Sequence, residues 1–181
     1  MSDTQWKRFQ VFVQEAAGRP HLDYGSVHAP DTELALLNAR DVFARRPDCV
    51  SMWIVPSEEI YSITAETLNN RQAVRQSDKQ ALPELYIVFI KSRKTGTMSY
   101  AGEVLASSPG DALERALVEF EKGPPVLVWW VFPERAVVKS ELRDIDSYFA
   151  PAREKSFRLS NDFHTVTDMR KIKHSAGRGT E

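Results

Sequence analysis

The chain has 181 residues, 42% hydrophobic and 27% charged, and its 24 lysines and arginines nearly balance 25 aspartates and glutamates. This composition is typical of a soluble globular protein, and a net charge of −1 excludes a strong general attraction to nucleic acid. The longest apolar run, Val126–Phe132, is far shorter than the roughly 20 residues that cross a bilayer, so no membrane span is expected.

The redox state and location follow from two further observations. Cys49 is the single cysteine, which rules out an intrachain disulfide and suits a reducing compartment. The first residues lack the basic start and apolar stretch of a secretory signal. We therefore expect a cytoplasmic protein.

The first predicted elements are two strands joined by a turn. Alternating apolar residues predict a strand at Phe9–Val13, and a second strand is expected at Leu22–Ala29. Asp31 has the position of a helix cap, and the residues after it repeat at helical spacing. The apolar positions of this helix are Ala35, Leu36, Ala39, Val42 and Phe43. A third strand is predicted at Val50–Val55.

The polar stretch 62–82 then predicts a linker with at most a short helix from about Ala65. Beyond it the pattern of strand, strand, helix and strand returns. The strands are expected at Leu85–Ile90, Met98–Ala106 and Val126–Phe132, and Ser108 is the expected helix cap. The first and last of these strands are apolar on both sides, which indicates either a central place in a sheet covered on both faces or covering by a partner.

The second set of elements repeats the first at a distance of 77 positions, without a gap from Phe9 to Ile60. The identical pairs are Val11/Val88, Phe12/Phe89, Gly25/Gly102, Val27/Val104, Ala29/Ala106, Ala35/Ala112, Leu36/Leu113, Ala39/Ala116, Phe43/Phe120, Pro47/Pro124, Trp53/Trp130 and Pro56/Pro133. All of them are packing or backbone residues. Such a repeat must be considered before the fold is assigned, and a unit of about 60 residues is marginal alone.

We therefore predict an α+β fold of two fused ββαβ repeats that share a core, followed by an irregular C-terminal extension. The predicted organisation is repeat 1 over 6–62, linker 63–82, repeat 2 over 83–143, a C-terminal docking segment 144–173 and a disordered tail 174–181.

The residues capable of chemistry form no recognisable site. Of the four histidines, His21, His28, His164 and His174, none has the Glu-x-x-His spacing that brings metal ligands onto one helical face. Cys49 aligns with Val126 in the repeat, which favours a small core residue over a nucleophile. Phosphate loops, dinucleotide fingerprints and serine nucleophile motifs do not occur. The sequence therefore predicts no catalytic, cofactor-binding or metal-binding residue in this chain.

Candidate contact residues come from the aromatic and adaptable side chains instead. Trp53 and Trp130 are predicted to be core residues, whereas Trp129 and its counterpart Met52 are predicted on the other side of the third strand, at a contact surface. The C-terminal segment bears aromatic residues that are expected to dock on this chain or on a partner. The full candidate interface is Met52, Trp129, Tyr148, Phe149, Phe157, Arg158 and Phe163.

These residues resemble a known family. The first repeat, with Trp6, Phe9–Val13, Gly25–Ala29, Ala35–Asp41 and Trp53–Val55, resembles the B subunit of phenylacetyl-CoA epoxidase. Residues 148–155, Phe157-Arg158 and Phe163-His164 are similar to that family's C-terminal segment. Typical members carry one copy, so this chain resembles a tandem-duplicated member whose fused halves replace a dimer of separate chains.

The resemblance implies a small α+β subunit without a catalytic role or a bound cofactor. Its implied partners are a catalytic oxygenase subunit that holds a diiron site and that subunit's structural homologue, with a homo-oligomer as a further option. The implied function is to bridge these subunits in a multicomponent oxygenase that epoxidises phenylacetyl-CoA. The alternative is a stand-alone small-molecule binding protein or enzyme that uses a cleft between the two repeats.

Overall fold

A computed structural model describes residues 6–44, 49–70, 82–121, 125–140, 148–150 and 169. The first half contains β1 (Lys7–Gln14), β2 (Leu22–Ala29), α1 (Thr32–Phe43), β3 (Ser51–Pro56), the 3-10 turn η1 (Ser57–Glu59), β4 (Tyr61–Thr64) and α2 (Ala65–Asn70). The second half contains β5 (Glu84–Lys91), β6 (Ser99–Ala106), α3 (Pro109–Phe120), β7 (Val128–Pro133), η2 (Glu134–Ala136) and β8 (Val138–Lys139). The prediction of a mixed α and β fold is confirmed.

Both long helices begin at the predicted caps. A carboxylate oxygen of Asp31 accepts a hydrogen bond from the Leu34 backbone N–H at 2.8 Å. In the second half the Ser108 hydroxyl oxygen accepts from the Asp111 N–H at 3.2 Å. Each cap satisfies one of the backbone donors that the first helical turn leaves without a partner, and this is why the helices start where they do.

The eight strands form one sheet in the order β4-β7-β5-β6-β2-β1-β3-β8, and every recorded pairing is antiparallel. The strand order contains an exchange between the halves. β4, the last strand of the first half, pairs with β7 of the second half. β8, the last strand of the second half, pairs with β3 of the first. Sequence analysis missed both exchanged strands, and Ser62 to Thr64, which it placed at the start of a polar linker, belong to β4.

The exchange is symmetric in register. Ser62 lies opposite Trp130 in one half, and Lys139 lies opposite Trp53 in the other; these two pairs are equivalent under the shift of 77 positions. At the centre of the sheet β2 meets β6 at Leu22 and Ser99, which are also equivalent. The pairings between the halves are therefore equivalent under the sequence repeat.

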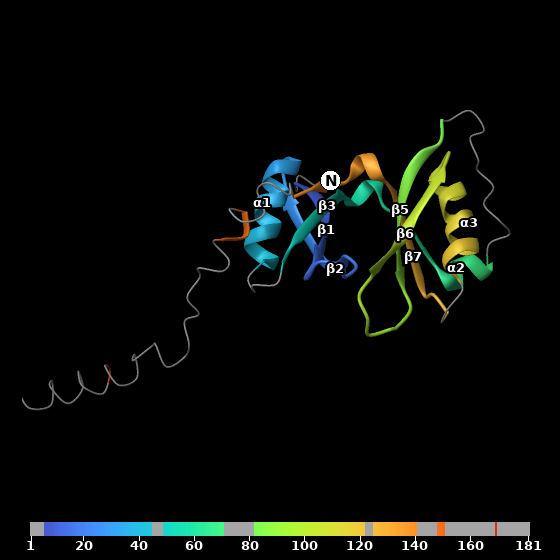
Figure 1. Ribbon diagram of the computed structural model, residues 1–181, viewed down its shortest axis with the longest axis horizontal. Helices are drawn as coiled ribbons and strands as arrows, with labels where there is room; N and C mark the ends of the chain where they lie inside the picture. The colour runs from blue at the N-terminus through green and yellow to red at the C-terminus, as the bar shows by residue number, and fades with distance from the viewer. Residues whose placement is uncertain are drawn as a thin grey trace, which may run out of the picture.

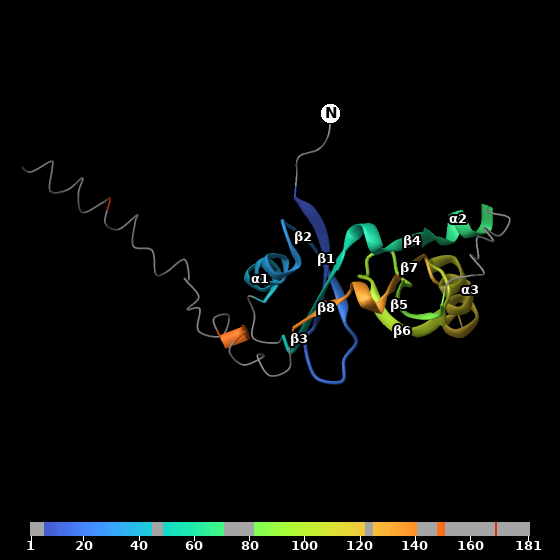
Figure 2. The same cartoon turned by 90° about the horizontal axis from the view of Figure 1, so that it is seen from above.

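The helices lie on the two outer sides of the molecule, with the strands between them (Figure 1). The view from above shows the same arrangement, with α1 and α3 at opposite ends (Figure 2). One hydrophobic core lies between α1 and the strands of the first half, and a second lies between α3 and the strands of the second half.

A third core joins the inner faces of the two halves. It contains Phe12 and Val55 from the first half and Ile87, Phe89, Met98 and Phe132 from the second. The ring centroids of Phe12 and Phe89, which are equivalent in the repeat, are 4.2 Å apart. β5 and β7, predicted to be covered on both faces, are covered within the chain, by α3 on one side and by this third core on the other.

Each hairpin bears a bulge at its glycine. Register shifts occur between Val11 and Phe12 opposite Gly25, and between Val88 and Phe89 opposite Gly102. Both glycines have positive φ, +120° and +159°. Each bulge locally bends its strand and increases its twist. No described helix is both long and apolar enough to cross a membrane.

Candidate partner interface

Two predicted contact residues, Met52 on β3 and Trp129 on β7, lie inside the chain. Their exposed fractions are 0% and 1%, respectively. Met52 packs in the core beneath α1, and Trp129 packs in the core beneath α3. Their expected role as exposed contact groups is corrected by the fold, because each helix folds back over this face of its strand.

Trp53 and Trp130 are more exposed than the sequence predicts. The sequence predicts them to be core residues, but both are only partly buried, at the border of the core between the halves. The Trp130 indole N–H donates to the Ser62 hydroxyl of the exchanged strand β4 at 2.9 Å. On the other side the Lys139 ammonium of β8 lies 5.1 Å from the Trp53 ring centroid. The two indoles therefore hold the exchanged strands in place.

His21 lies where the two halves meet and is only 7% exposed. Its ring stacks on Trp53 at 3.7 Å between centroids, and Nε2 lies 3.0 Å from the Ser51 hydroxyl. Its carbonyl accepts a hydrogen bond from the Tyr100 N–H of β6. Burial, assisted by the nearby positive charge of Lys139, lowers the pKa of His21 to about 4. The imidazole is therefore neutral at pH 7 and serves the junction between the halves.

Tyr148 and Phe149 dock on this chain itself. Phe149 is 2% exposed within the core beneath α1, and Tyr148 packs against the same core. The Tyr148 hydroxyl donates to the Leu36 carbonyl, and the Arg40 guanidinium lies 5.2 Å from the Tyr148 ring centroid. These contacts place a segment that follows the second half on the helix of the first half.

The corresponding segment of the first half makes the reverse connection. α2, which follows β4, packs Leu68 against the core of the second half. Each half is thus completed by a strand and a further segment from the other. The remaining predicted contact residues, Phe157, Arg158 and Phe163, lie outside the described residues.

Two described side chains that are capable of chemistry, Cys49 and Asp23, are buried or hydrogen-bonded within the fold. The Cys49 thiol is buried, and burial raises its pKa to about 12. Within the described ranges, no group of three or more histidine, cysteine, aspartate or glutamate side chains is placed to hold a metal ion. Asp23 accepts from the Gln10 amide and the Gly25 N–H, and it supports the bulge of β2.

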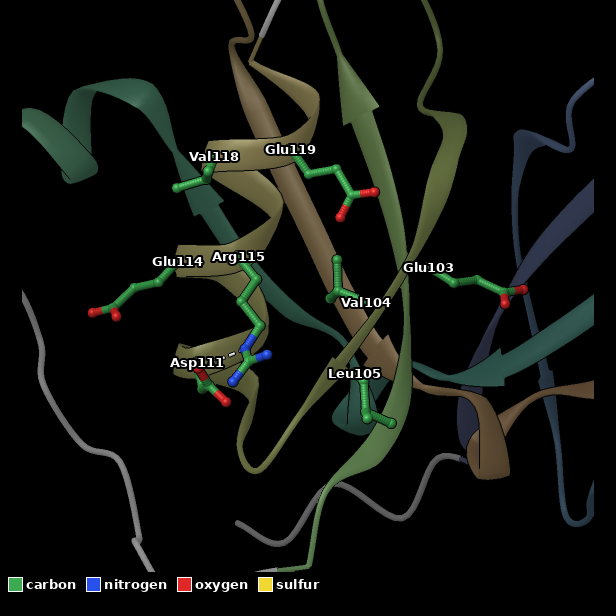
Figure 3. Close-up of a pocket in the computed structure, with 8 residues that line it drawn as sticks. All are labelled: Glu103, Val104, Leu105, Asp111, Glu114, Arg115, Val118 and Glu119. Atoms are coloured by element: carbon green, nitrogen blue, oxygen red, sulfur yellow. Dashed lines mark hydrogen bonds and ion pairs between the residues drawn. The ribbon is translucent and has the colours of Figure 1, made fainter.

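A groove lies between α3 and β6, with a volume of about 580 Å³ (Figure 3). Its apolar part includes Leu105 of β6, 55% exposed, and Val118 of α3, 80% exposed. Its lining residues are Glu103, Val104, Leu105, Asp111, Glu114, Arg115, Val118 and Glu119. In Figure 3 Glu119 extends from the helix toward β6, while Arg115 turns toward Asp111.

The charge of this groove is strongly negative. Four carboxylates and one guanidinium line it, a net formal charge of −3. The guanidinium, that of Arg115, is bound to Asp111 with an Nε to Oδ1 distance of 3.0 Å. That contact and a hydrogen bond from the Ser107 N–H lower the pKa of Asp111. The positive charge of the groove is therefore already neutralised within it.

Comparison with known proteins places the chain in a family. The family model PaaB, phenylacetic acid degradation B, matches it in two segments, residues 5–80 and residues 83–170. The chain belongs to the phenylacetic acid degradation B family. The two segments divide the chain as the symmetry of the sheet does, so this family member carries the family sequence in tandem.

One relative is the B subunit of 1,2-phenylacetyl-CoA epoxidase from Escherichia coli (strain K12). It is 41% identical over 66 residues, which cover 36% of this chain and 70% of the relative. The relative is therefore about as long as one half of this chain. No solved structure matches the chain.

The groove is the surface that sequence analysis missed. A signal for it was present, because the repeat pairs Leu105 with His28 and Glu119 with Val42. The identical pairs of the repeat are packing or backbone residues, whereas these two pairs differ in polarity or charge. A comparison of equivalent positions would therefore have revealed a surface that only one half of this phenylacetic acid degradation B protein carries.

Proposed function

We propose that this chain is a non-catalytic bridging subunit of a multicomponent diiron oxygenase that epoxidises the ring of phenylacetyl-CoA. Its partners would be the catalytic subunit and that subunit's structural homologue. The diiron centre belongs to the partner, and this chain supplies no ligand to it. Two fused ββαβ repeats with a shared core provide the scaffold for the bridge.

One observation carries the proposal: a family sequence named for an epoxidase subunit occurs twice here, in halves that exchange strands β4 and β8. The exchange gives one chain two outward sides, one with α1 and one with α3, at opposite ends of the molecule (Figure 2). A rigid body with two separate sides suits a subunit that holds two others together. Fusion removes the cost of bringing two separate chains together.

The alternative, a small-molecule protein with a cleft between the repeats, requires space at their junction. The structure places packed aromatic rings there instead. Centroid distances among Phe12, Phe89 and Phe132 are 4.2, 5.5 and 5.7 Å, which are contact distances. The bridging proposal is therefore the better supported of the two.

Co-purification tests the proposal. The tagged full chain is co-expressed with the catalytic diiron subunit and its structural homologue and is purified at low salt. We expect all three chains in one complex by size-exclusion chromatography with light scattering. We also expect phenylacetyl-CoA epoxidation only from preparations that include the catalytic subunit and its reductase.

The isolated chain is the control for the absence of a catalytic role. It should contain substoichiometric iron by elemental analysis and should leave phenylacetyl-CoA unchanged. Stoichiometric iron in the isolated chain, turnover by it, or failure to co-purify at low salt would each overturn the proposal.

A further inference from the structure

Beyond its first residues, one edge of β6 pairs with no described strand. Its first residues meet β2, with a backbone hydrogen bond of 2.9 Å from the Tyr100 N–H to the His21 carbonyl. Beyond this point β2 and β6 run in opposite directions and diverge. Among the described residues, Gly102 to Ala106 pair with β5 on one side only. Such an edge is a template for a further strand.

On the equivalent edge of the first half, one backbone carbonyl already has a side-chain donor. The Asn38 side-chain amide donates to the His28 carbonyl of β2 at 3.3 Å, and a His28 ring nitrogen lies 3.0 Å from the Trp6 carbonyl oxygen. Arg115 occupies the position of Asn38 in the second half, but its guanidinium is held by Asp111. The side chain at this helix position therefore contacts the strand edge in the first half, whereas in the second half it contacts its own helix.

The surface beside the open edge is both apolar and acidic. Leu105 and Val118 are exposed there, and Glu103, Glu114 and Glu119 add three carboxylates beyond the Asp111–Arg115 pair. The equivalent positions of the first half are Ser26, Val27, His28, Leu34, Leu37, Asn38, Asp41 and Val42. These first-half positions include one carboxylate and a neutral histidine, so their net formal charge is −1. The groove of the second half has a net formal charge of −3.

We propose that the groove between α3 and β6 binds an extended basic segment of a partner protein, which adds to the edge of β6 as a further strand. Backbone hydrogen bonds to β6 would hold the segment, and alternate side chains would face the groove. Lysine or arginine side chains of the segment would pair with Glu114 and Glu119, and apolar ones would cover Leu105. This inference rests on the proposed function only for the identity of the partner.

Charge complementarity selects this occupant over a second copy of the chain. Two β6 edges paired with each other would bring two grooves of charge −3 together. The basic run of this chain, Arg170–Lys173, follows Tyr148 and Phe149, which are anchored beneath α1. The groove lies at the other end of the molecule, beside α3 (Figures 1 and 3). We propose a separate protein as the occupant, and the cross-linking test below distinguishes it from the basic run of this chain.

The first test uses a synthetic peptide with alternating lysine and valine, with a glutamate-for-lysine peptide as the control. The probe is added to the ¹⁵N-labelled full chain, and amide chemical shifts are followed by NMR. We expect changes at Glu103–Ala106 and along α3 with the lysine peptide only, weakening as salt is added. Changes spread evenly over the surface, or equal binding of both peptides, would overturn the proposal.

Matched variants place a lysine at equivalent exposed positions of the two halves. Glu119→Lys on α3 should weaken binding of the lysine peptide by about fivefold or more, the loss expected of an interface residue that contributes measurably to binding. Val42→Lys on α1 is the control and should leave the affinity unchanged. Both positions are exposed, so both variants should fold, which is checked by their circular dichroism and urea midpoints. Equal affinities of the two variants would contradict the assignment.

The second test uses the assembled oxygenase complex and a carbodiimide, which links carboxylates directly to lysines. We expect Glu114 or Glu119 to be joined to a lysine of a partner subunit. Links to Lys171 or Lys173 of this chain, or a dimer joined through β6, would overturn the choice of occupant. If no complex forms, the bridging function fails while the peptide test still decides the groove; if the complex forms without these links, the groove proposal fails alone.

Discussion

Gly102→Ala offers a sharp test of how each helix packs on its hairpin. A Cβ atom built at Gly102 would lie 2.5 Å from Cζ and 2.7 Å from Cε1 of Phe120, the last residue of α3. Real side chains do not tolerate contacts this short, so the ring or the end of the helix must move. We expect the substitution to lower the free energy of unfolding by about 2–4 kcal/mol, combining the overlap with backbone strain.

The first half provides a matched control. At Gly25 the same Cβ would lie 3.4 Å from Cζ of Phe43, an ordinary contact, but φ there is +120°, which L-residues rarely adopt. Gly25→Ala should therefore cost about 1–3 kcal/mol from backbone strain alone. The two equivalent substitutions are destabilising for different reasons.

Double-mutant cycles separate these reasons. Urea unfolding, followed by tryptophan fluorescence, is measured for each glycine variant with and without truncation of its phenylalanine. Phe120→Ala should relieve at least about 1 kcal/mol of the Gly102→Ala cost, whereas Phe43→Ala should give a coupling energy near zero with Gly25→Ala. Equal coupling in both halves, or a cost below about 0.5 kcal/mol for Gly102→Ala, would refute the reasoning.

Four further outcomes can be measured. Folding lowers the His21 pKa from 6.5 to about 4, so the unfolded state binds the proton first as the pH falls. The free energy of unfolding should therefore fall by about 2–3 kcal/mol between pH 6.5 and pH 4. His21→Phe should remove this component, and an unchanged pH profile would contradict it. Phe149→Ala should cost about 3–5 kcal/mol in urea unfolding, because the ring fills the core beneath α1, and a negligible cost would show that the segment is not docked. The Cys49 thiol should resist iodoacetamide at pH 8 in the native protein and react in urea; rapid native labelling would disprove its burial. A chain expressed as two pieces divided between Asn70 and Leu82 should co-purify, because β4 and β8 pair across the halves, whereas separation of the pieces would speak against the exchange.

Local signals account for what could be predicted from the sequence. The strand at Leu22–Ala29 has the bounds that the sequence predicts, and the caps at Asp31 and Ser108 are where they are expected. These features depend on residues near each other along the chain. The motifs of the first repeat and of the C-terminal segment also indicated membership of the phenylacetic acid degradation B family, since such a resemblance is read from the residues alone.

The exchange of strands could not be predicted in this way. β4 and β8 have four and two residues, and their sequences are not apolar enough to stand out from a linker. What makes them strands is the edge that each one meets on β7 or β3, which depends on how the two halves are placed together. Strand pairing between distant segments has no marker in either segment alone.

Which side of the third strand becomes core also depends on contacts between distant segments. Alternation along Val128–Pro133 shows that Trp129 and Trp130 face opposite sides, but it does not say which side the helix covers. The sequence by itself determined the longer elements, their caps and the duplication, because those can be read from the residues along the chain. Only the tertiary structure decided which faces are buried, which strands are exchanged and which edge of β6 stays open, because those depend on contacts between residues far apart in the chain.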